Sequence, residues 1–280
     1  MKQGCNLSPT LFNIFINDIP NLFNSKSCDP VKLDDSELSC LLYADDLVIM
    51  SESESGLQHC LQKLESYTRK WKLQVNLKKS KILIFGTQSQ GRLFISSKWC
   101  FGDKQLDCVE EYTYLGLTFH FAGNFKIAMA TLYNKALRVY HCLMNKLSNA
   151  ENIPIKTLLK LFSSLVVPVL LYGCEIWGVY LLGKISSLEL FENKFFSIVN
   201  KLESLQLKFF KRILGVHSKS TNLAVYGELG RVPLIVQIST LLTKYWVRIK
   251  NPNYLDTLVG KASSLNIRSN SQAVILQTTI

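Results

Sequence analysis

Histidine and paired cysteines are scarce in this chain, and their scarcity argues against a zinc site. The 280 residues contain four histidines and eight cysteines, and no two cysteines form a C-x-x-C pair. A structural zinc site needs several such ligands at short spacing. Most of the cysteines stand among apolar residues, as buried free thiols do, and this fits a reducing, intracellular compartment.

Long apolar runs are also absent. The first ten residues are polar and lack the apolar core of a signal peptide. Residues 161–174 carry no charge, but Pro168 and Gly173 interrupt them, and the run is shorter than the ~20 residues that span a bilayer. We therefore expect a buried helix there, no membrane partner and no secretion. The sequence leaves the oligomeric state unknown.

Acidic residues are few in the second part of the chain. Residues 1–120 carry 13 Lys and Arg against 14 Asp and Glu, whereas residues 121–280 carry 19 against 7, giving net charges of −1 and +12. A basic half is a candidate surface for a polyanion such as nucleic acid. Charge alone leaves an ordinary solvated basic face as an alternative of equal weight.

Apolar spacing predicts an α+β part at the start of the chain. Ser8 and Pro9 predict the start of an amphipathic helix that Pro20 ends, followed by an irregular segment over residues 21–37. Ser55 and Gln58 form a capping-box pattern before the next helix, which leads to a strand near residues 81–85. Short alternating runs with turn residues then predict further strands up to Phe119.

From residue 124 the pattern changes to long helices. We expect one over residues 125–147, a second after Pro154, and a third over residues 185–214 with Gly215 as its C-cap. The final segment, residues 263–280, shows no clear periodicity. The change from strands to helices coincides with the change in charge.

Asp45 and Asp46 are the candidates for chemistry. Two short apolar runs flank them, which predicts a β-hairpin with both acids at its tip. Adjacent carboxylates between apolar strands need a compensating charge, and Mg²⁺ prefers carboxylate and water oxygen. An ordinary hairpin turn is the alternative, because Asp is a common turn residue.

The neighbouring blocks resemble the reverse transcriptases of non-LTR (LINE-like) retrotransposons. Residues 3–9 (QGCNLSP) with 11–15 (LFNIF), residues 43–46 (YADD), residues 71–81 (with Trp71, Asn76 and Lys79-Ser80-Lys81) and residues 114–116 (YLG) are similar to four blocks of that family, in the family's order. Residues 170–178, 210–215 and 227–233 resemble its thumb region more loosely. The resemblance extends from about residue 2 to about residue 235.

This resemblance implies a fold and a domain order. The fold class is α+β: a partial right-hand polymerase palm, with an antiparallel sheet and helices, followed by an all-α thumb. The implied domains are a partial palm over residues 1–121, a helical thumb or connection region over 122–250, and a weakly patterned tail over 251–280. The implied partners are an RNA template, a DNA primer and deoxynucleoside triphosphates, and the implied location is nuclear.

The resemblance also implies roles for single residues. Asp45 and Asp46 would hold Mg²⁺ in a two-metal mechanism, and Lys79 would protonate or neutralise the leaving pyrophosphate as a catalytic residue, unless it belongs to a solvated basic turn. The remaining implied site residues are Gln3, Gly4, Tyr43 and Lys81 for substrate binding, and Tyr114, Leu115 and Gly116 for the primer grip. Asn76 would fix the turn before the strand.

Four basic residues of the third long helix share a broad face that fits the phosphates of a duplex: Lys201, Lys208, Lys211 and Arg212. A solvated face is the alternative. The opposite face is expected to be core and consists of Phe191, Phe195, Val199, Leu202, Phe209 and Ile213. We interpret residues 171–177 as packing rather than as a platform for stacking bases.

One departure from the family bears on activity. In these polymerases a further metal-binding Asp precedes the Q-G block, and here that block begins at residue 3. We therefore expect an incomplete metal cage, an unpaired sheet edge, and no polymerase activity from this chain alone. Three hypotheses remain: a polymerase core that needs a longer product, a non-catalytic remnant that binds nucleic acid, and a decayed reading frame.

Overall fold

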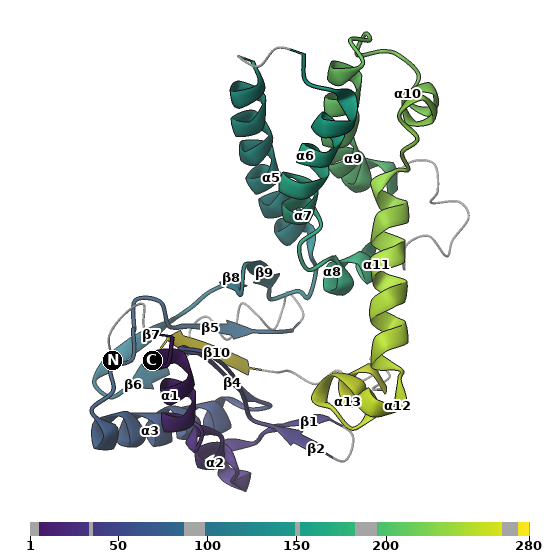
Figure 1. Cartoon of the computed structure of the whole chain (residues 1–280). Coiled ribbons are helices and arrows are strands. Elements are labelled where there is room, and N and C mark those ends of the chain that lie inside the picture. Colours follow the sequence, from purple (N-terminus) through teal and green to yellow (C-terminus); the bar gives the residue numbers. More distant parts are fainter. Residues whose placement is uncertain are drawn as a thin grey trace. The chain divides into compact units, whose positions relative to one another are not determined.

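The computed structural model describes residues 6–33, 36–86, 99–148, 152–182, 195–264 and 274–279. The chain divides into two compact units. The first comprises Met1–Tyr114, Phe119–Gly123 and Leu255–Ile280, and the second comprises Leu115–Thr118 and Asn124–Tyr254. Figure 1 labels the helices and strands of each unit.

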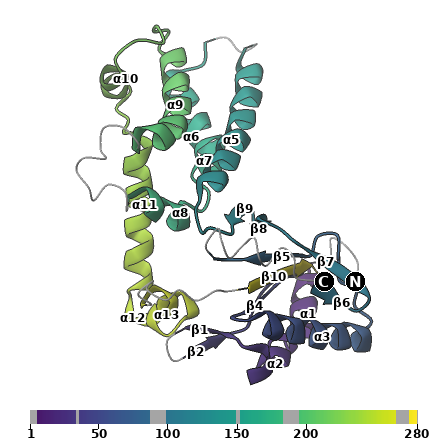
Figure 2. The same ribbon diagram turned by 180° about the vertical axis from the view of Figure 1, so that it is seen from behind.

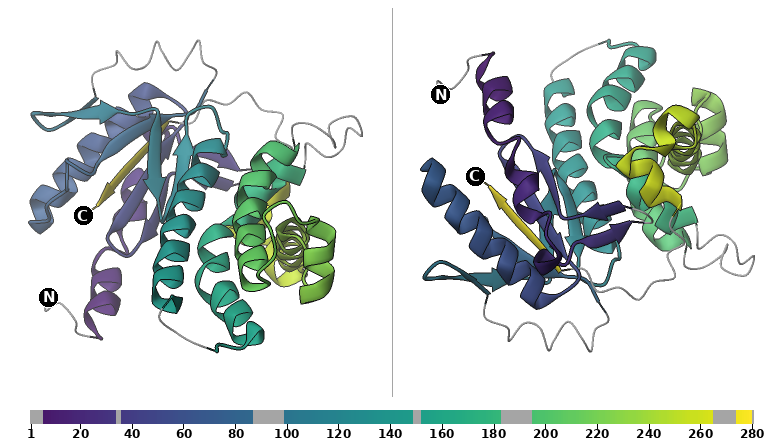
Figure 3. Two further views of the ribbon diagram at one scale, coloured as in Figure 1. Left: turned by 90° about the horizontal axis from the view of Figure 1, so that it is seen from above. Right: turned by 90° about the horizontal axis from the view of Figure 1, so that it is seen from below.

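A six-stranded sheet is the centre of the first unit (Figure 1). Its strand order is β3-β4-β10-β5-β7-β6. All neighbours are antiparallel except β5 and β7, which are parallel. Helix α3 (Glu54–Trp71) runs along one face of this sheet (Figure 3). The strands are β3 (Cys40–Tyr43), β4 (Asp46–Ser51), β5 (Lys81–Ile84), β6 (Trp99–Phe101), β7 (Lys104–Cys108) and β10 (Val274–Thr279).

Strand β4 shows how the two faces of the sheet differ. Side chains alternate between the faces of a strand, so the continuous apolar run of β4 must be covered on both sides. Leu47 and Ile49 are fully buried in a core that they share with Leu57 of α3. Val48 and Met50 point the other way and line a pocket on the opposite face.

Helix α3 begins at a different serine from the one predicted. Ser53 has the extended backbone that an N-cap requires, and its hydroxyl accepts a hydrogen bond from the N–H of Gly56 at 3.1 Å. Ser55 already lies inside the helix, so the predicted Ser55–Gln58 capping box is wrong. The Gln58 amide instead exchanges hydrogen bonds of 2.9 and 3.2 Å with the backbone of Cys100.

The segment before the hairpin is more ordered than predicted. The expected single helix is two helices, α1 (Ser8–Phe15) and α2 (Ile19–Phe23), because Pro20 lies in the first turn of α2 instead of ending a helix. The predicted irregular segment holds a 3-10 helix, η1 (Lys26–Cys28), and two paired strands, β1 (Val31–Leu33) and β2 (Ser36–Leu38).

Strand β10 corrects one expectation. The tail was expected to lack pattern, yet β10 pairs with all six residues of β4 on one side and with β5 on the other. An unpaired sheet edge was also expected, without a strand being named for it. The described sheet has its edges at β3 and β6.

The second unit is helical (Figure 2). The predicted helices over residues 125–147 and after Pro154 are confirmed as α5 and α6. Residues 185–194 of the third predicted helix lie outside the described residues, and Gly215 follows its end with a φ of 65°. The helices are α5 (Lys126–Leu147), α6 (Ile155–Leu165), α7 (Val167–Leu170), α8 (Cys174–Leu182), α9 (Phe195–Ile213), α10 (Asn222–Leu229) and α11 (Leu234–Ile249), followed along the chain by α12 (Pro252–Leu255) and α13 (Leu258–Ser264).

Aromatic stacking and one close helix crossing hold the second unit together. Phe162 of α6 stacks on Phe209 of α9 with ring centroids 4.3 Å apart. Gly178 lets α8 approach α11, because a Cβ at this position would lie 2.9 Å from Leu242. Of the predicted core residues on α9, Leu202 and Phe209 are buried and Ile213 is half-buried. The side chains of Phe191, Phe195 and Val199 lie outside the described residues.

The uncharged run over residues 161–174 is not one buried helix. α6 ends at Leu165, α7 restarts with Pro168 in its first turn, and Gly173 has a φ of 65°. In the part of the chain that the structure describes, no helix is long and apolar enough to cross a membrane. The mixture of helices and antiparallel sheets agrees with the predicted α+β class, while the predicted domain ends at residues 121 and 250 stay predictions.

Candidate functional site

The two central acids lie at the tip of a β-hairpin, as predicted. Tyr43 and Asp46 are paired residues of β3 and β4, so Ala44 and Asp45 form a two-residue turn. Ala44 has a φ of 52°, in the left-handed region that residues with a Cβ seldom adopt. Such local strain is typical of functional turns.

The two carboxylates differ in their surroundings. Asp45 is exposed at the turn, whereas Asp46 begins β4 and is half-buried. The nearby strand β8 (Glu111–Tyr114) brings the phenols of Tyr112 and Tyr114 close enough to sense Asp46. Burial raises the pKa of both tyrosines, and the negative charge of Asp46 raises each pKa further. Both phenols are therefore neutral at physiological pH and keep their O–H donors.

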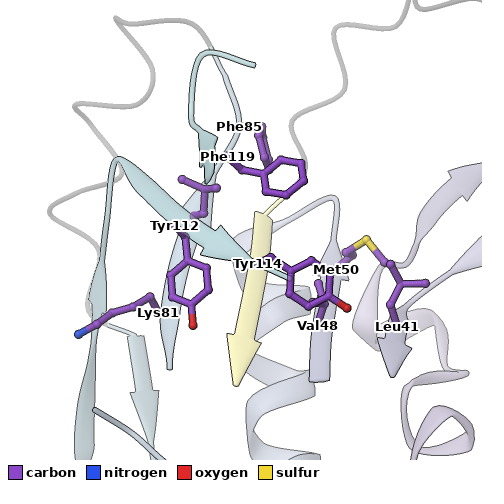
Figure 4. Close-up of a pocket in the computed structure, with 9 residues that line it drawn as sticks. Leu41, Val48, Met50, Lys81, Phe85, Tyr112, Tyr114 and Phe119 are labelled. Atoms are coloured by element: carbon purple, nitrogen blue, oxygen red, sulfur yellow. The ribbon is translucent and has the colours of Figure 1, made fainter. Parts of the chain in front are cut away.

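A pocket of about 220 Å³ lies on the face of the sheet opposite α3 (Figure 4). Its lining is apolar and aromatic, and it includes the rings of both β8 tyrosines. The pocket therefore lies against one face of β4, the strand that Asp46 begins. The lining residues are Leu41, Val48, Met50, Lys81, Leu83, Phe85, Tyr112, Tyr114 and Phe119.

Lys81 has an acidic partner within the sheet. Its ammonium group pairs with Asp107 of β7 at 2.5 Å, and Figure 4 shows it directed away from the pocket. The predicted role of Lys81 in substrate binding stays a prediction. Lys79 is exposed, with its backbone N–H held by the Asn76 side chain at 3.3 Å and its carbonyl accepting from Tyr112 at 2.9 Å. Asn76 fixes this turn, as predicted.

The structure does not place every predicted substrate residue. Gln3 and Gly4 lie outside the described residues, so their predicted position beside the acids stays a prediction. Tyr43 is described and lies next to the turn, with 62% of its surface exposed. Its predicted role in substrate binding stays a prediction.

The predicted primer-grip turn joins β8 to β9 (Leu117–His120). Leu115 has a φ of 46° and Gly116 a φ of 84°, so two consecutive residues adopt the left-handed region. Tyr114 belongs to the first unit, whereas Leu115 and Gly116 belong to the second. In the second unit, the hydroxyl of Tyr172 donates to the carbonyl of Leu115 at 2.6 Å.

The four predicted basic residues of α9 have different environments. Lys201 and Arg212 are exposed. The ammonium group of Lys208 lies 5.6 Å from the ring centroid of Tyr140, and that of Lys211 donates to the carbonyl of Ser218 at 2.7 Å. Local partners thus hold Lys208 and Lys211, which leaves Lys201 and Arg212 as the better candidates for phosphate contact.

Three residues of these sites were missed from the sequence. Tyr112 had a usable signal, because it stands two residues before Tyr114 in an alternating strand. Tyr172 was interpreted as packing, but it is exposed, whereas Leu171, Cys174 and Trp177 of the same segment are buried. Lys135 approaches the carbonyl of Gly116 at 3.4 Å, and nothing in its local sequence indicates this contact.

Metal ligands beyond the acid pair are absent from what the structure describes. Within those residues, no three His, Cys, Asp or Glu side chains lie together as a metal site. Asp45 and Asp46 are adjacent oxygen donors of the type that Mg²⁺ prefers, so the pair fits part of such a site. A complete cage needs at least one further donor.

An acidic hairpin on an antiparallel sheet backed by helices fits the class of metal-dependent nucleotidyltransferases. The sequence comparison agrees: residues 1–119 match the family described as reverse transcriptase (RNA-dependent DNA polymerase). That part of the chain is similar to reverse transcriptase domains, and the curated relatives are named as polymerases or polyproteins of mobile elements, in agreement with the resemblance seen in the sequence.

Two curated relatives show how far the similarity extends. The chain is 24% identical over 275 residues to the RNA-directed DNA polymerase from mobile element jockey of Drosophila melanogaster. It is 27% identical over 265 residues to the Pol polyprotein of the type-1 retrotransposable element R2 of Popillia japonica. These alignments cover 95% and 90% of this chain but 27% and 39% of the relatives. No solved structure matches the chain.

Proposed function

We propose that this chain supplies the metal-binding palm hairpin and the thumb of an RNA-directed DNA polymerase of a non-LTR retrotransposon. Its substrates are deoxynucleoside triphosphates, and its partners are an RNA template and a DNA primer. The observation that carries the proposal is the β3–β4 hairpin, which places Asp45 in the turn and Asp46 at the start of β4, within the residues that match the reverse transcriptase family.

The acid pair contributes charge and oxygen ligands to the reaction. Asp45 and Asp46 would hold magnesium, which when bound would favour ionisation of the primer 3′-hydroxyl and neutralise charge on the departing pyrophosphate. The strained turn at Ala44 keeps the two carboxylates at the exposed end of β4. Tyr43 covers one side of the nucleotide, and Lys79, exposed in its turn, protonates or neutralises the pyrophosphate.

We infer that these 280 residues do not extend a primer by themselves. The described residues offer a pair of carboxylates and no larger ligand cluster, and productive two-metal geometry needs a full cage. The chain spans 27% of the jockey polymerase and 39% of the R2 polyprotein, so a further segment is the natural source of the missing ligand. The free cysteines of the described part support an intracellular location.

Metal binding tests the carrying observation directly. Electron paramagnetic resonance of Mn²⁺, a substitute for Mg²⁺, is expected to show bound metal that Asp45→Asn and Asp46→Asn each weaken. Asp103→Asn is the matched control, because Asp103 is an exposed acid in the two-residue turn between β6 and β7. Equal Mn²⁺ binding by all three variants would contradict a metal site at this hairpin.

Primer extension with Mg²⁺ tests the second part of the proposal. The purified chain is expected to bind an RNA template annealed to a DNA primer and to add no nucleotides. Incorporation that Asp45→Asn abolishes would overturn the inference of inactivity and show a complete site. Binding of the template–primer duplex without affinity for Mn²⁺ would favour a non-catalytic nucleic-acid-binding protein. The net charge of +12 over residues 121–280 is the observation that supports this alternative.

A further inference from the structure

A groove of about 610 Å³ lies between α3 and α2, wholly within the first unit. None of its lining residues belongs to the β3–β4 hairpin, so it is separate from the acid pair. Its volume is within the range of sites that bind small molecules. Most of its lining residues are polar or charged, unlike those of the pocket on the other face of the sheet. They are Asp18, Leu22, His59, Gln62, Lys63, Ser66, Tyr67, Lys70 and Trp71.

Two lysines bring positive charge to this groove. Lys63 and Lys70 are seven residues apart, so they lie on the same face of α3, about 10 Å apart along its axis. Among the described residues, no carboxylate forms an ion pair with either lysine. Lys63 donates to the hydroxyl of Ser25 at 2.5 Å, and this neutral partner leaves its charge uncompensated. Both ammonium groups therefore have charge and donors for an anion such as phosphate.

The acidic residues near the groove already have other partners. Asp18 accepts a hydrogen bond of 2.5 Å from the hydroxyl of Tyr67. Glu65 forms an ion pair with Arg69 at 2.7 Å on the same helix. Neither carboxylate pairs with the two lysines, so the groove keeps a surplus of positive charge.

An exposed indole lies at one end of the groove. Trp71 is the last residue of α3, and 42% of its surface is exposed. Phe15 packs edge-on against it with ring centroids 5.5 Å apart, and the ammonium group of Lys70 lies 5.3 Å from its ring centroid. The indole is thus held beside a cation without being buried. An aromatic surface next to positive charge is the combination that binds the bases and phosphates of a single strand.

We propose that this groove binds a short stretch of single-stranded nucleic acid, apart from the catalytic hairpin. Lys63 and Lys70 contact different phosphates of the strand, and the exposed part of the Trp71 indole stacks with a base. A single strand fits the groove better than a duplex, because a base must leave its duplex stack to reach the indole. This inference goes beyond the proposed function, because it does not require metal at the hairpin.

Salt dependence of RNA binding tests the two lysines. Fluorescence anisotropy of the full chain measures its affinity for a labelled single-stranded oligouridylate over a range of salt concentrations. Lys63→Gln and Lys70→Gln are each expected to weaken binding and to lower the slope of log affinity against log salt by about 0.7. Lys63→Arg keeps the charge and is expected to keep the slope.

Lys104→Gln is the matched control, because Lys104 is an exposed cation of the same unit outside the groove. If this variant lowers affinity and slope as much as Lys63→Gln and Lys70→Gln do, the groove is overturned as the site and only general charge remains. Absence of any RNA binding by the wild-type chain overturns the proposal as well.

Indole fluorescence tests the contact with a base. Stacking with a base quenches an indole, so the oligouridylate is expected to quench the wild-type chain, and Trp71→Phe is expected to lose most of that quenching. Trp71→Leu, which has no ring, is expected to weaken binding about ten-fold. Trp246→Phe is the control, because Trp246 of α11 has a similar exposed fraction of 40%. Quenching that persists in Trp71→Phe and disappears in Trp246→Phe would place the strand on the second unit and overturn the proposal.

The groove and the metal site can fail separately. Asp45→Asn is expected to weaken Mn²⁺ binding and to leave RNA affinity unchanged, whereas Lys63→Gln is expected to weaken RNA binding and to leave Mn²⁺ binding unchanged. A fall in RNA affinity in Asp45→Asn equal to that in Lys63→Gln would place the RNA at the hairpin and overturn the groove.

Discussion

The backbone N–H of Leu234 donates a hydrogen bond of 2.7 Å to the carboxylate of Glu203, joining the first residue of α11 to the middle of α9. The same carboxylate accepts from the hydroxyl of Tyr226 on α10 and from the amide of Gln206. One carboxyl group therefore ties three helices together, and it satisfies a backbone donor that the start of α11 would otherwise leave unpaired.

This arrangement makes stability depend on pH. Burial raises the pKa of Glu203 to about 7, and the hydrogen bonds from Leu234 and Gln206 only partly oppose that rise. The folded chain then holds this proton more tightly than the unfolded chain does. The stabilising contribution is fully present below pH 4.5, the ordinary value, and is lost as the pH rises to about 7.

Glu203→Gln is therefore expected to flatten the pH dependence of unfolding. The amide can still accept from Leu234, but it does not ionise. Urea unfolding at pH 5 and pH 8 should differ by up to about 3 kcal/mol more in the wild type than in this variant. Glu228→Gln, an exposed acid on α10, serves as the control and should leave the dependence intact. Parallel curves for Glu203→Gln and wild type would contradict the prediction.

A second prediction separates the observed cap of α3 from the predicted one. Ser53→Ala removes the acceptor for the N–H of Gly56 and should destabilise the chain by about 1 kcal/mol. Ser55→Ala, within the first turn of the same helix, should change stability by a few tenths of that amount. Midpoints of urea unfolding measure the stability of both variants. A larger loss of stability in Ser55→Ala than in Ser53→Ala would support the Ser55 capping box instead.

Local patterns predicted the acidic hairpin and the helices α5 and α6, because each depends on residues close together in the sequence. The continuous apolar run of β4 and the two acids before it were enough to place Asp45 and Asp46 at a turn. The capping error was of the same local kind: two serines two residues apart give the same signal, and only the backbone conformation decides between them.

Contacts between distant segments could not be predicted in this way. Tyr172 and Leu115 are 57 residues apart, and neither has a local pattern that indicates the other. Strand β10 is the extreme case, because it pairs with β4 and β5, which lie far away from it in the sequence. The pairing of Lys81 with Asp107 could not be predicted for the same reason, because the two residues are 26 positions apart.

The turn at Ala44 gives a third prediction. Replacing Ala44 by glycine removes the Cβ that makes a φ of 52° unfavourable, and the gain is partly offset by the greater entropy of unfolded glycine. Ala44→Gly should therefore stabilise the chain by up to about 1 kcal/mol. Ala44→Val, which is β-branched, should destabilise it by more than that. Thermal unfolding checks both, and equal melting temperatures would argue against strain at this turn.

The last prediction concerns the position of β10 in the sheet. Leu276 pairs with Ile49 of β4 and with Ile82 of β5, so a proline there removes a ladder N–H between two neighbouring strands. Leu276→Pro should destabilise the first unit by about 1–3 kcal/mol, the typical result of leaving a buried acceptor unpaired. Hydrogen exchange should become faster at the amides of both β4 and β5, because each loses its neighbour. Leu276→Ala keeps the N–H and should preserve their protection. Unchanged exchange in the proline variant would show that β10 does not occupy this place in solution.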